Sequence, residues 1–122
     1  MLPAMTTIGP EMAISISTNR RRNTGMAKYA LYVQLKAKPG KAADVEAFLK
    51  QGAELAKAES GTVSWYGIKE DDDAYAVFDT FDDEAGRDAH LSGDIAKALM
   101  AKADELFSNK LEIHRIGIIA DK

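Results

Sequence analysis

Residues 75–93, YAVFDTFDDEAGRDAHLSG, change from the pattern of a strand to the pattern of a helix within one short stretch. The first half is rich in aromatic and branched side chains, which fit a pleated, half-buried surface. The acidic run from Asp82 to Glu84 then suits a helix start, because the unpaired amide groups there favour carboxylates. The stretch therefore predicts a strand followed by a short helix that carries His90.

Alternating side chains predict four strands, and helical spacing predicts the segments between them. The expected strands are residues 29–36, 62–69, 74–81 and 111–120. The first helix ends at Gly61, which we expect to form a left-handed cap. The second helix follows the third strand, with a kink at Ser92 and Gly93. This order predicts an α+β protein with the ferredoxin-like βαββαβ arrangement and an antiparallel sheet.

Residues 70–73 are four adjacent acidic side chains that form the turn between the second and third strands. In this hairpin we expect Trp65 beside Phe78 and Tyr66 beside Val77. The acidic run also suggests a calcium or magnesium site. Calcium-binding loops, however, alternate their ligands and contain a glycine, and this run does neither. We therefore expect no metal site.

Aromatic side chains occur on both faces of the predicted sheet. A sheet that is apolar on both sides must be covered on both sides. The chain has only two long predicted helices, which suffice for one face. A second copy of the same sheet is the most economical cover for the other face, so the sequence predicts a homodimer.

The composition excludes several classes of protein. The absence of cysteine excludes disulfides, thiolate nucleophiles and cysteine-bound metal centres. The formal charge is -3 and no basic stripe follows a predicted helix, so we expect no nucleic acid partner. No apolar run reaches the roughly 20 residues that cross a bilayer, and no secretion signal is evident. We therefore expect no membrane partner and a cytoplasmic location.

The 122 residues fit one domain that is preceded by an arm. Residues 1–27 contain short apolar pieces and three consecutive arginines but no sustained period, which is typical of a flexible arm outside the core. Met26 within this segment resembles a natural translation start. The folded domain is expected at residues 28–122.

Residues 28–122 resemble the antibiotic-biosynthesis monooxygenase family. The likeness rests on the strand AYAVFDTF, the acidic helix start DDE, the segment DAHLSG and a closing apolar strand. Within it, Phe78, Asp79 and Phe81 are followed by His90. The resemblance implies a dimeric α+β barrel whose two sheets face each other. It also implies relatives that oxidise quinols and polycyclic phenols without a cofactor, degrade haem, or isomerise a small phosphorylated signal.

The residues that distinguish the haem-degrading members are not matched. Those members resemble one another in an asparagine on the first strand, a tryptophan in the second helical region and a later histidine. Here Val33 or Gln34, His90 and Met100 stand near these three positions. We therefore expect neither haem nor another cofactor.

A cofactor-free monooxygenase must deprotonate its substrate and keep the bound ring dry. His90 is the candidate base, because the ordinary pKa of histidine lies near neutral pH. Asp79 is the candidate that orients His90 or binds a substrate hydroxyl. The candidate walls for a flat aromatic ring are Trp65, Tyr66, Tyr32 and Phe78. Each residue also has a structural interpretation: His90 as a capping group, and the aromatic side chains as core or dimer-interface residues.

Two function hypotheses follow. The first is a small cofactor-independent monooxygenase that acts on a quinol or a polycyclic phenol. The second is a non-enzymatic dimeric barrel that binds or sequesters a small metabolite. The sequence contains no feature that decides between them.

Overall fold

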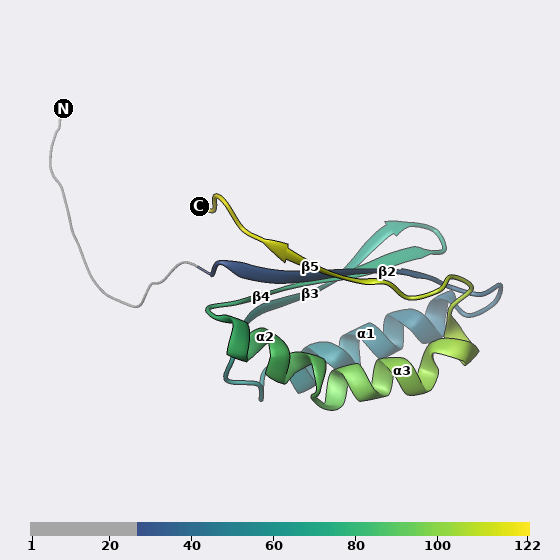
Figure 1. Cartoon of the computed structure of the whole chain (residues 1–122). Helices are drawn as coiled ribbons and strands as arrows, with labels where there is room; N and C mark the ends of the chain where they lie inside the picture. Colours follow the sequence, from purple (N-terminus) through teal and green to yellow (C-terminus); the bar gives the residue numbers. More distant parts are fainter. Residues whose placement is uncertain (1–26) are drawn as a thin grey trace, which may run out of the picture.

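The computed structural model describes residues 27–122. A four-stranded sheet forms one layer and three helices form the other (Figure 1). The elements are β2 (Tyr29–Lys36), α1 (Ala42–Ala56), β3 (Thr62–Asp71), β4 (Ala74–Phe81), α2 (Glu84–Leu91), α3 (Asp94–Leu106) and β5 (Ile113–Gly117). All strand pairs are antiparallel. The predicted α+β, ferredoxin-like arrangement is confirmed.

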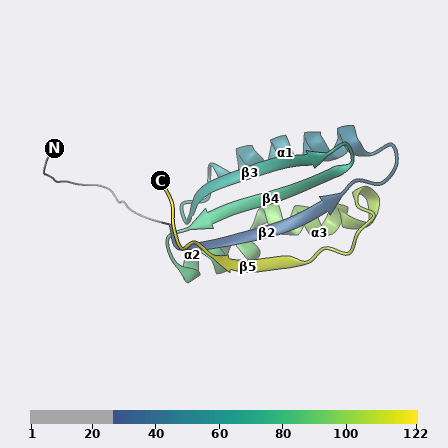
Figure 2. The same cartoon turned by 90° about the horizontal axis from the view of Figure 1, so that it is seen from above.

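The strands lie side by side in the order β3-β4-β2-β5, which Figure 2 shows from above. β2 and β4 are therefore central, and β3 and β5 form the edges. The crossover through α1 places β2 and β3, the first two strands of the described residues, apart, with β4 between them. As a result β4, the strand that leads into α2, lies directly between β3 and β2.

The face of the sheet that packs against the helices carries the core. Val33 and Leu35 of β2 lie opposite Val77 and Tyr75 of β4, and all four side chains are buried. The helices and the segment after α3 complete this core with Val45, Leu49, Leu99, Leu106 and Phe107. Burying each large apolar side chain contributes about 1.5–3 kcal/mol, so this face holds the two layers together.

The opposite face carries a row of four ring side chains that crosses all four strands. Tyr66 of β3 lies opposite Phe78 of β4, Phe78 lies opposite Tyr32 of β2, and Tyr32 lies opposite His114 of β5. Tyr66 is 56% exposed. None of the described helices covers this face (Figure 1). An uncovered aromatic row of this kind is what the two-sided pattern of the strands predicts.

The hairpin register differs from the expected one by a single residue. Trp65 pairs with Asp79 and Tyr66 pairs with Phe78, so the expected pairs Trp65–Phe78 and Tyr66–Val77 are wrong. The β3–β4 ladder is irregular next to the acidic turn and again at the start of β3. A bulge there shifts the register, and because side chains alternate, it decides which ones share a face.

The first helix ends earlier than expected. α1 stops at Ala56, its cap residue Lys57 keeps a right-handed helical conformation, and Gly61 is not a left-handed cap. Gly61 is instead pressed against α2: a Cβ on Gly61 would lie 3.0 Å from the Cα of Gly86. The position requires glycine because two backbones meet there.

Two further expectations concern the ends of the chain. The last strand is shorter than the predicted 111–120 and spans Ile113–Gly117. The expected arm, residues 1–27, lies outside the described residues except for Ala27, which is buried. Within residues 27–122, no helix combines the length and apolar character needed to span a membrane.

Candidate functional site

The junction between β4 and α2 places His90 above the sheet. α2 begins as the acidic run predicts, because the Asp83 side chain accepts a hydrogen bond from the Gly86 amide at 2.7 Å and caps the helix. Arg87 and His90 are the buried residues of this helix, three positions apart and therefore on one face. The capped start fixes the helix direction, and His90 in its last turn reaches the strand that precedes it.

His90 is held between two carboxylates. Its Nε2 lies 2.9 Å from Oδ2 of Asp79 on β4, and its Nδ1 lies 2.6 Å from Oε1 of Glu59 in the α1–β3 loop. The side chains of His90 and Asp79 are 7% and 1% exposed, and that of Glu59 is 21% exposed. The ring of Phe81 packs beside the imidazole, with the centroids 5.3 Å apart. His90 and Asp79, two of the candidate site residues, are thus in contact.

This arrangement favours the charged form of the imidazole. Both ring nitrogens can donate to carboxylates only when both carry a proton. Burial is the largest influence on the His90 pKa and lowers it, but the hydrogen bonds that the ring donates to Asp79 and Glu59, with the charges of these carboxylates, outweigh burial and raise the pKa above 6.5. The geometry therefore favours the imidazolium, which can donate a charge-assisted hydrogen bond to each of the two carboxylates.

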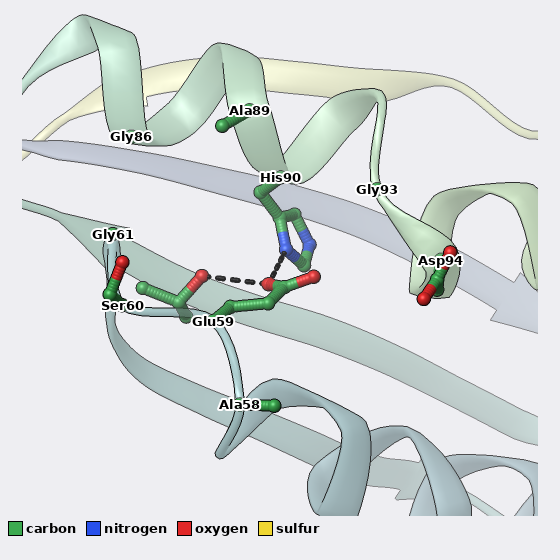
Figure 3. Close-up of a pocket in the computed structure, with 10 residues that line it drawn as sticks. Ala58, Glu59, Ser60, Gly61, Gly86, Ala89, His90, Gly93 and Asp94 are labelled. Carbon is green, nitrogen blue, oxygen red and sulfur yellow. Dashed lines mark hydrogen bonds and ion pairs between the residues drawn. The ribbon is translucent and has the colours of Figure 1, made fainter.

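Glu59 is a site residue that the sequence patterns did not reveal. Its Oε1 accepts hydrogen bonds from both Thr62 and His90, the former at 2.9 Å, and Figure 3 shows these two contacts. Its Oε2 lies 3.0 Å from where a Cβ on Gly93 would stand. Glu59 lies in an irregular loop with no periodicity of its own, so only the packing of that loop against α2 brings it to His90.

A hollow of about 350 Å³ opens beside this trio. Its walls are mostly backbone and small side chains, including Gly61, Gly86, Ala89 and Gly93 (Figure 3). His90 borders the hollow although it is almost completely buried. A molecule bound there would meet the imidazole edge together with the polar side chains of Glu59 and Asp94.

A second hollow of about 380 Å³ lies on the other side of Glu59. Trp65 borders it, and Glu59 and Thr62 border both hollows. Trp65 faces the helices, directly opposite Asp79 on the neighbouring strand. The indole Nε1 of Trp65 and the Oδ1 of Asp79 are both buried and lack a hydrogen-bond partner.

The predicted site residues divide between the two faces of the sheet. His90, Asp79 and Trp65 lie on the helix side, near one another. The other three candidates, Tyr32, Tyr66 and Phe78, belong to the row on the opposite face. Tyr32 donates a hydrogen bond to Glu70 at 2.7 Å there. None of these three borders the hollow beside His90.

The described side chains offer no ready metal centre. Within residues 27–122, no three histidine, aspartate or glutamate side chains are placed so as to hold a metal ion. The acidic residues 71–73 of the hairpin turn are exposed.

These observations define a small ferredoxin-like α+β protein with a buried histidine, held between two carboxylates, beside a surface hollow. The chain belongs to the antibiotic biosynthesis monooxygenase family, whose sequence profile matches residues 28–102. A comparison with curated proteins gave no match.

Several solved structures are similar to this one. A protein of unknown function from Nitrosomonas europaea is 48% identical, with a TM-score of 0.76, over 80% of this chain and 94% of that one. A Pseudomonas aeruginosa protein is 18% identical, with a TM-score of 0.67 over 80% and 100% of the two chains. A Chloroflexus aurantiacus protein, named only provisionally as an antibiotic biosynthesis monooxygenase, is 23% identical, with a TM-score of 0.62 over 79% and 97%. The last two likenesses concern the fold alone.

Proposed function

We propose that this chain is a small monooxygenase that oxidises a quinol or a polycyclic phenol without a cofactor. The observation that supports this function is the charged His90, held by two carboxylates at the edge of a hollow of about 350 Å³. That volume falls in the range of about 300–1,000 Å³ that is usual for small-molecule sites.

The imidazolium of His90 would act on the hydroxyl group of the substrate. Where the phenol oxygen takes the place of Glu59 at His90 Nδ1, the charged N–H donor favours the ionised phenol and so lowers the pKa of the bound hydroxyl. The ionised ring is electron-rich enough to reduce O₂ directly. With 1,4-naphthohydroquinone, one quinol and one O₂ would give one 2-hydroxy-1,4-naphthoquinone and one water. One oxygen atom enters the ring as a hydroxyl, the other becomes water, and the substrate supplies all four electrons.

Asp79 and Trp65, which lie next to the hollow beside His90 without lining it, would support this reaction. Asp79 fixes the orientation and the charge of His90 through its Oδ2. Its Oδ1 and the Nε1 of Trp65 are buried and lack hydrogen-bond partners among the described residues. We propose that Trp65 also forms one wall of the ring site.

We further propose that two copies pair through the uncovered sheet face to form an α+β barrel. The row of Tyr66, Phe78, Tyr32 and His114 would then be buried between the sheets. This places three of the predicted aromatic wall residues in the interface. A cytoplasmic location fits a chain without cysteine.

Oxygen uptake with 1,4-naphthohydroquinone tests the proposed reaction. We expect protein-dependent uptake without added flavin or metal, and hydroxynaphthoquinone that carries one atom from isotopically heavy O₂. His90→Gln should lower the rate at least about tenfold, because it removes the charged donor. Asp88→Asn, an exposed position on the same helix, is the matched control. The absence of uptake across a panel of quinols and anthrones would overturn the enzymatic function.

The charge of His90 also favours the second hypothesis, a barrel that binds an acidic phenol without turnover. An imidazolium holds an anion well but is not a base. In that case hydroxynaphthoquinone should raise the melting temperature of the protein, while no oxygen is consumed. The two assays together separate the alternatives.

A further inference from the structure

Glu59 separates the two hollows of the site. It borders both of them. Its carboxylate lies against the Nδ1 atom of His90, where a bound molecule would otherwise contact the imidazole (Figure 3). The backbone of its loop is anchored: the Glu59 amide donates to Ala56 and its carbonyl accepts from the Thr62 amide. Only the side chain can therefore move readily, by rotation about its single bonds.

The Glu59 carboxylate occupies the place of a ligand oxygen. Oε1 accepts a hydrogen bond from the charged imidazole at 2.6 Å. The ionised oxygen of a phenol needs the same donor in the same direction. The Glu59 carboxylate and a phenolate cannot both accept the hydrogen bond from His90 Nδ1, because their negative oxygens would occupy the same position.

One neighbour holds the carboxylate in this place and another leaves room for it. The Thr62 hydroxyl donates to Oε1 at 2.9 Å. On the other side, a Cβ at position 93 would approach Oε2 to 3.0 Å, closer than nearly all real contacts of that kind, so Gly93 leaves room for the carboxylate. With the Glu59 side chain turned outward, the two hollows would join into one groove that runs from Gly93 to Trp65.

We propose that Glu59 is a built-in competitor, a latch that mimics the substrate oxyanion and must be displaced from His90 before an acidic phenol can bind. The identity of the ligand class rests on the proposed function, whereas the latch itself rests on the Glu59 contacts. The apparent affinity for such a ligand is then reduced by the small fraction of molecules in which the latch is open.

The test measures binding of 2-hydroxy-1,4-naphthoquinone, a flat ring with an ionised oxygen at neutral pH that should bind without being oxidised further. Trp65 is the only tryptophan of the chain and borders the second hollow, so its fluorescence quenching reports binding directly. Glu59→Gln should tighten the dissociation constant at least about tenfold, because a charge-assisted hydrogen bond of the latch is weakened. Glu54→Gln removes an exposed carboxylate of α1 and is the matched control.

A second variant separates displacement from simple charge repulsion. Thr62→Val keeps every charge but removes one hydrogen bond that holds the latch, and we expect it to tighten binding by about threefold to tenfold. Equal binding by the wild type and Glu59→Gln overturns the latch. Tighter binding by Glu59→Gln with no change in Thr62→Val also overturns it, since repulsion alone then suffices. If Glu59→Gln does not fold, Thr62→Val decides alone.

These outcomes are independent of catalysis. A tightened dissociation constant without oxygen uptake would keep the latch and remove the enzymatic function. Oxygen uptake with unchanged dissociation constants would keep the enzyme and remove the latch.

Discussion

Asp79→Asn removes the buried carboxylate that faces His90 and leaves the shape of the side chain almost unchanged. Asp79 is 1% exposed, and its Oδ2 lies 2.9 Å from His90 Nε2. In the variant, Glu59 is the remaining carboxylate partner of the imidazolium. The substitution therefore tests how strongly the buried pair stabilises the fold.

The expected loss follows from the geometry of the pair. Two unit charges at this separation attract by about 6 kcal/mol at an effective dielectric constant of about 20. Desolvation offsets much of this attraction, yet removing one partner of a buried pair typically costs about 3–5 kcal/mol. Because the ring of His90 can release its proton when Asp79 is lost, we expect the lower end, about 3 kcal/mol near pH 6.

The loss should shrink as the pH rises. The His90 pKa is raised in the folded protein, so the stability that the charged ring provides is fully present below its unfolded value of 6.5. That stability is lost as the pH rises through the higher folded-state pKa. Wild type and Asp79→Asn should thus differ most near pH 6 and much less at about pH 9 or above.

Urea unfolding, followed by circular dichroism and by the fluorescence of Trp65, measures both quantities. Asp88→Asn breaks an exposed ion pair and should cost at most about 1 kcal/mol. In a double-mutant cycle, the effects of Asp79→Asn and His90→Gln should not add, because both remove the same interaction. An equal loss at both pH values, or additive losses, would refute the account of the pair.

Three further substitutions test the packing and the proposed dimer. Gly86→Ala places a Cβ 2.8 Å from the carbonyl oxygen of Gly61, so it should lower the free energy of unfolding by about 1–3 kcal/mol, and unchanged stability would contradict this close approach. Gly52→Ala brings a Cβ within 3.0 Å of the Trp65 ring, so it should shift the tryptophan emission, while the gain of about 1 kcal/mol in helix propensity offsets the crowding. Tyr66→Lys introduces a charge into the row on the open sheet face and should produce monomers in sedimentation velocity, whereas an intact dimer would place the interface elsewhere.

The sequence predicts the fold well because the signals are local. Strand alternation and helical spacing are each visible within a few residues, and both survive in the structure. The acidic run predicts the start of α2, where Asp83 is the capping residue. The contact between His90 and Asp79 is also consistent with the sequence order, because a helix that follows a strand and packs back on the sheet contacts that strand.

The sequence also implies that the candidate site residues divide between the two faces of the sheet, because side chains alternate along a strand. Phe78 and Asp79 are neighbours on one strand, so their side chains point to opposite faces. A single site on one face therefore cannot contain both. The same parity separates Trp65 from Tyr66, and the register decides that Trp65 is the one that shares a face with Asp79. The bulges set that register, and they carry no simple sequence signal.

The role of Glu59 cannot be predicted from the sequence, for a different reason. Its approach to His90 depends on the contact between the α1–β3 loop and α2, where Gly61 and Gly86 meet backbone to backbone. That contact joins residues far apart in the chain, and no periodicity records it. Gly61 does look like a helix cap by its local sequence, although its actual role is to permit this contact.

The charge of His90 is the claim on which the proposed function most depends, and NMR of nitrogen-labelled protein measures it directly. His114→Gln assigns the signals, because the chain contains only two histidines. We expect both ring nitrogens of His90 to be protonated at neutral pH, with a pKa above 6.5 that falls when Asp79 is replaced by asparagine. A neutral His90 ring at pH 6.5, or a pKa that does not respond to Asp79→Asn, would contradict an imidazolium held between two carboxylates.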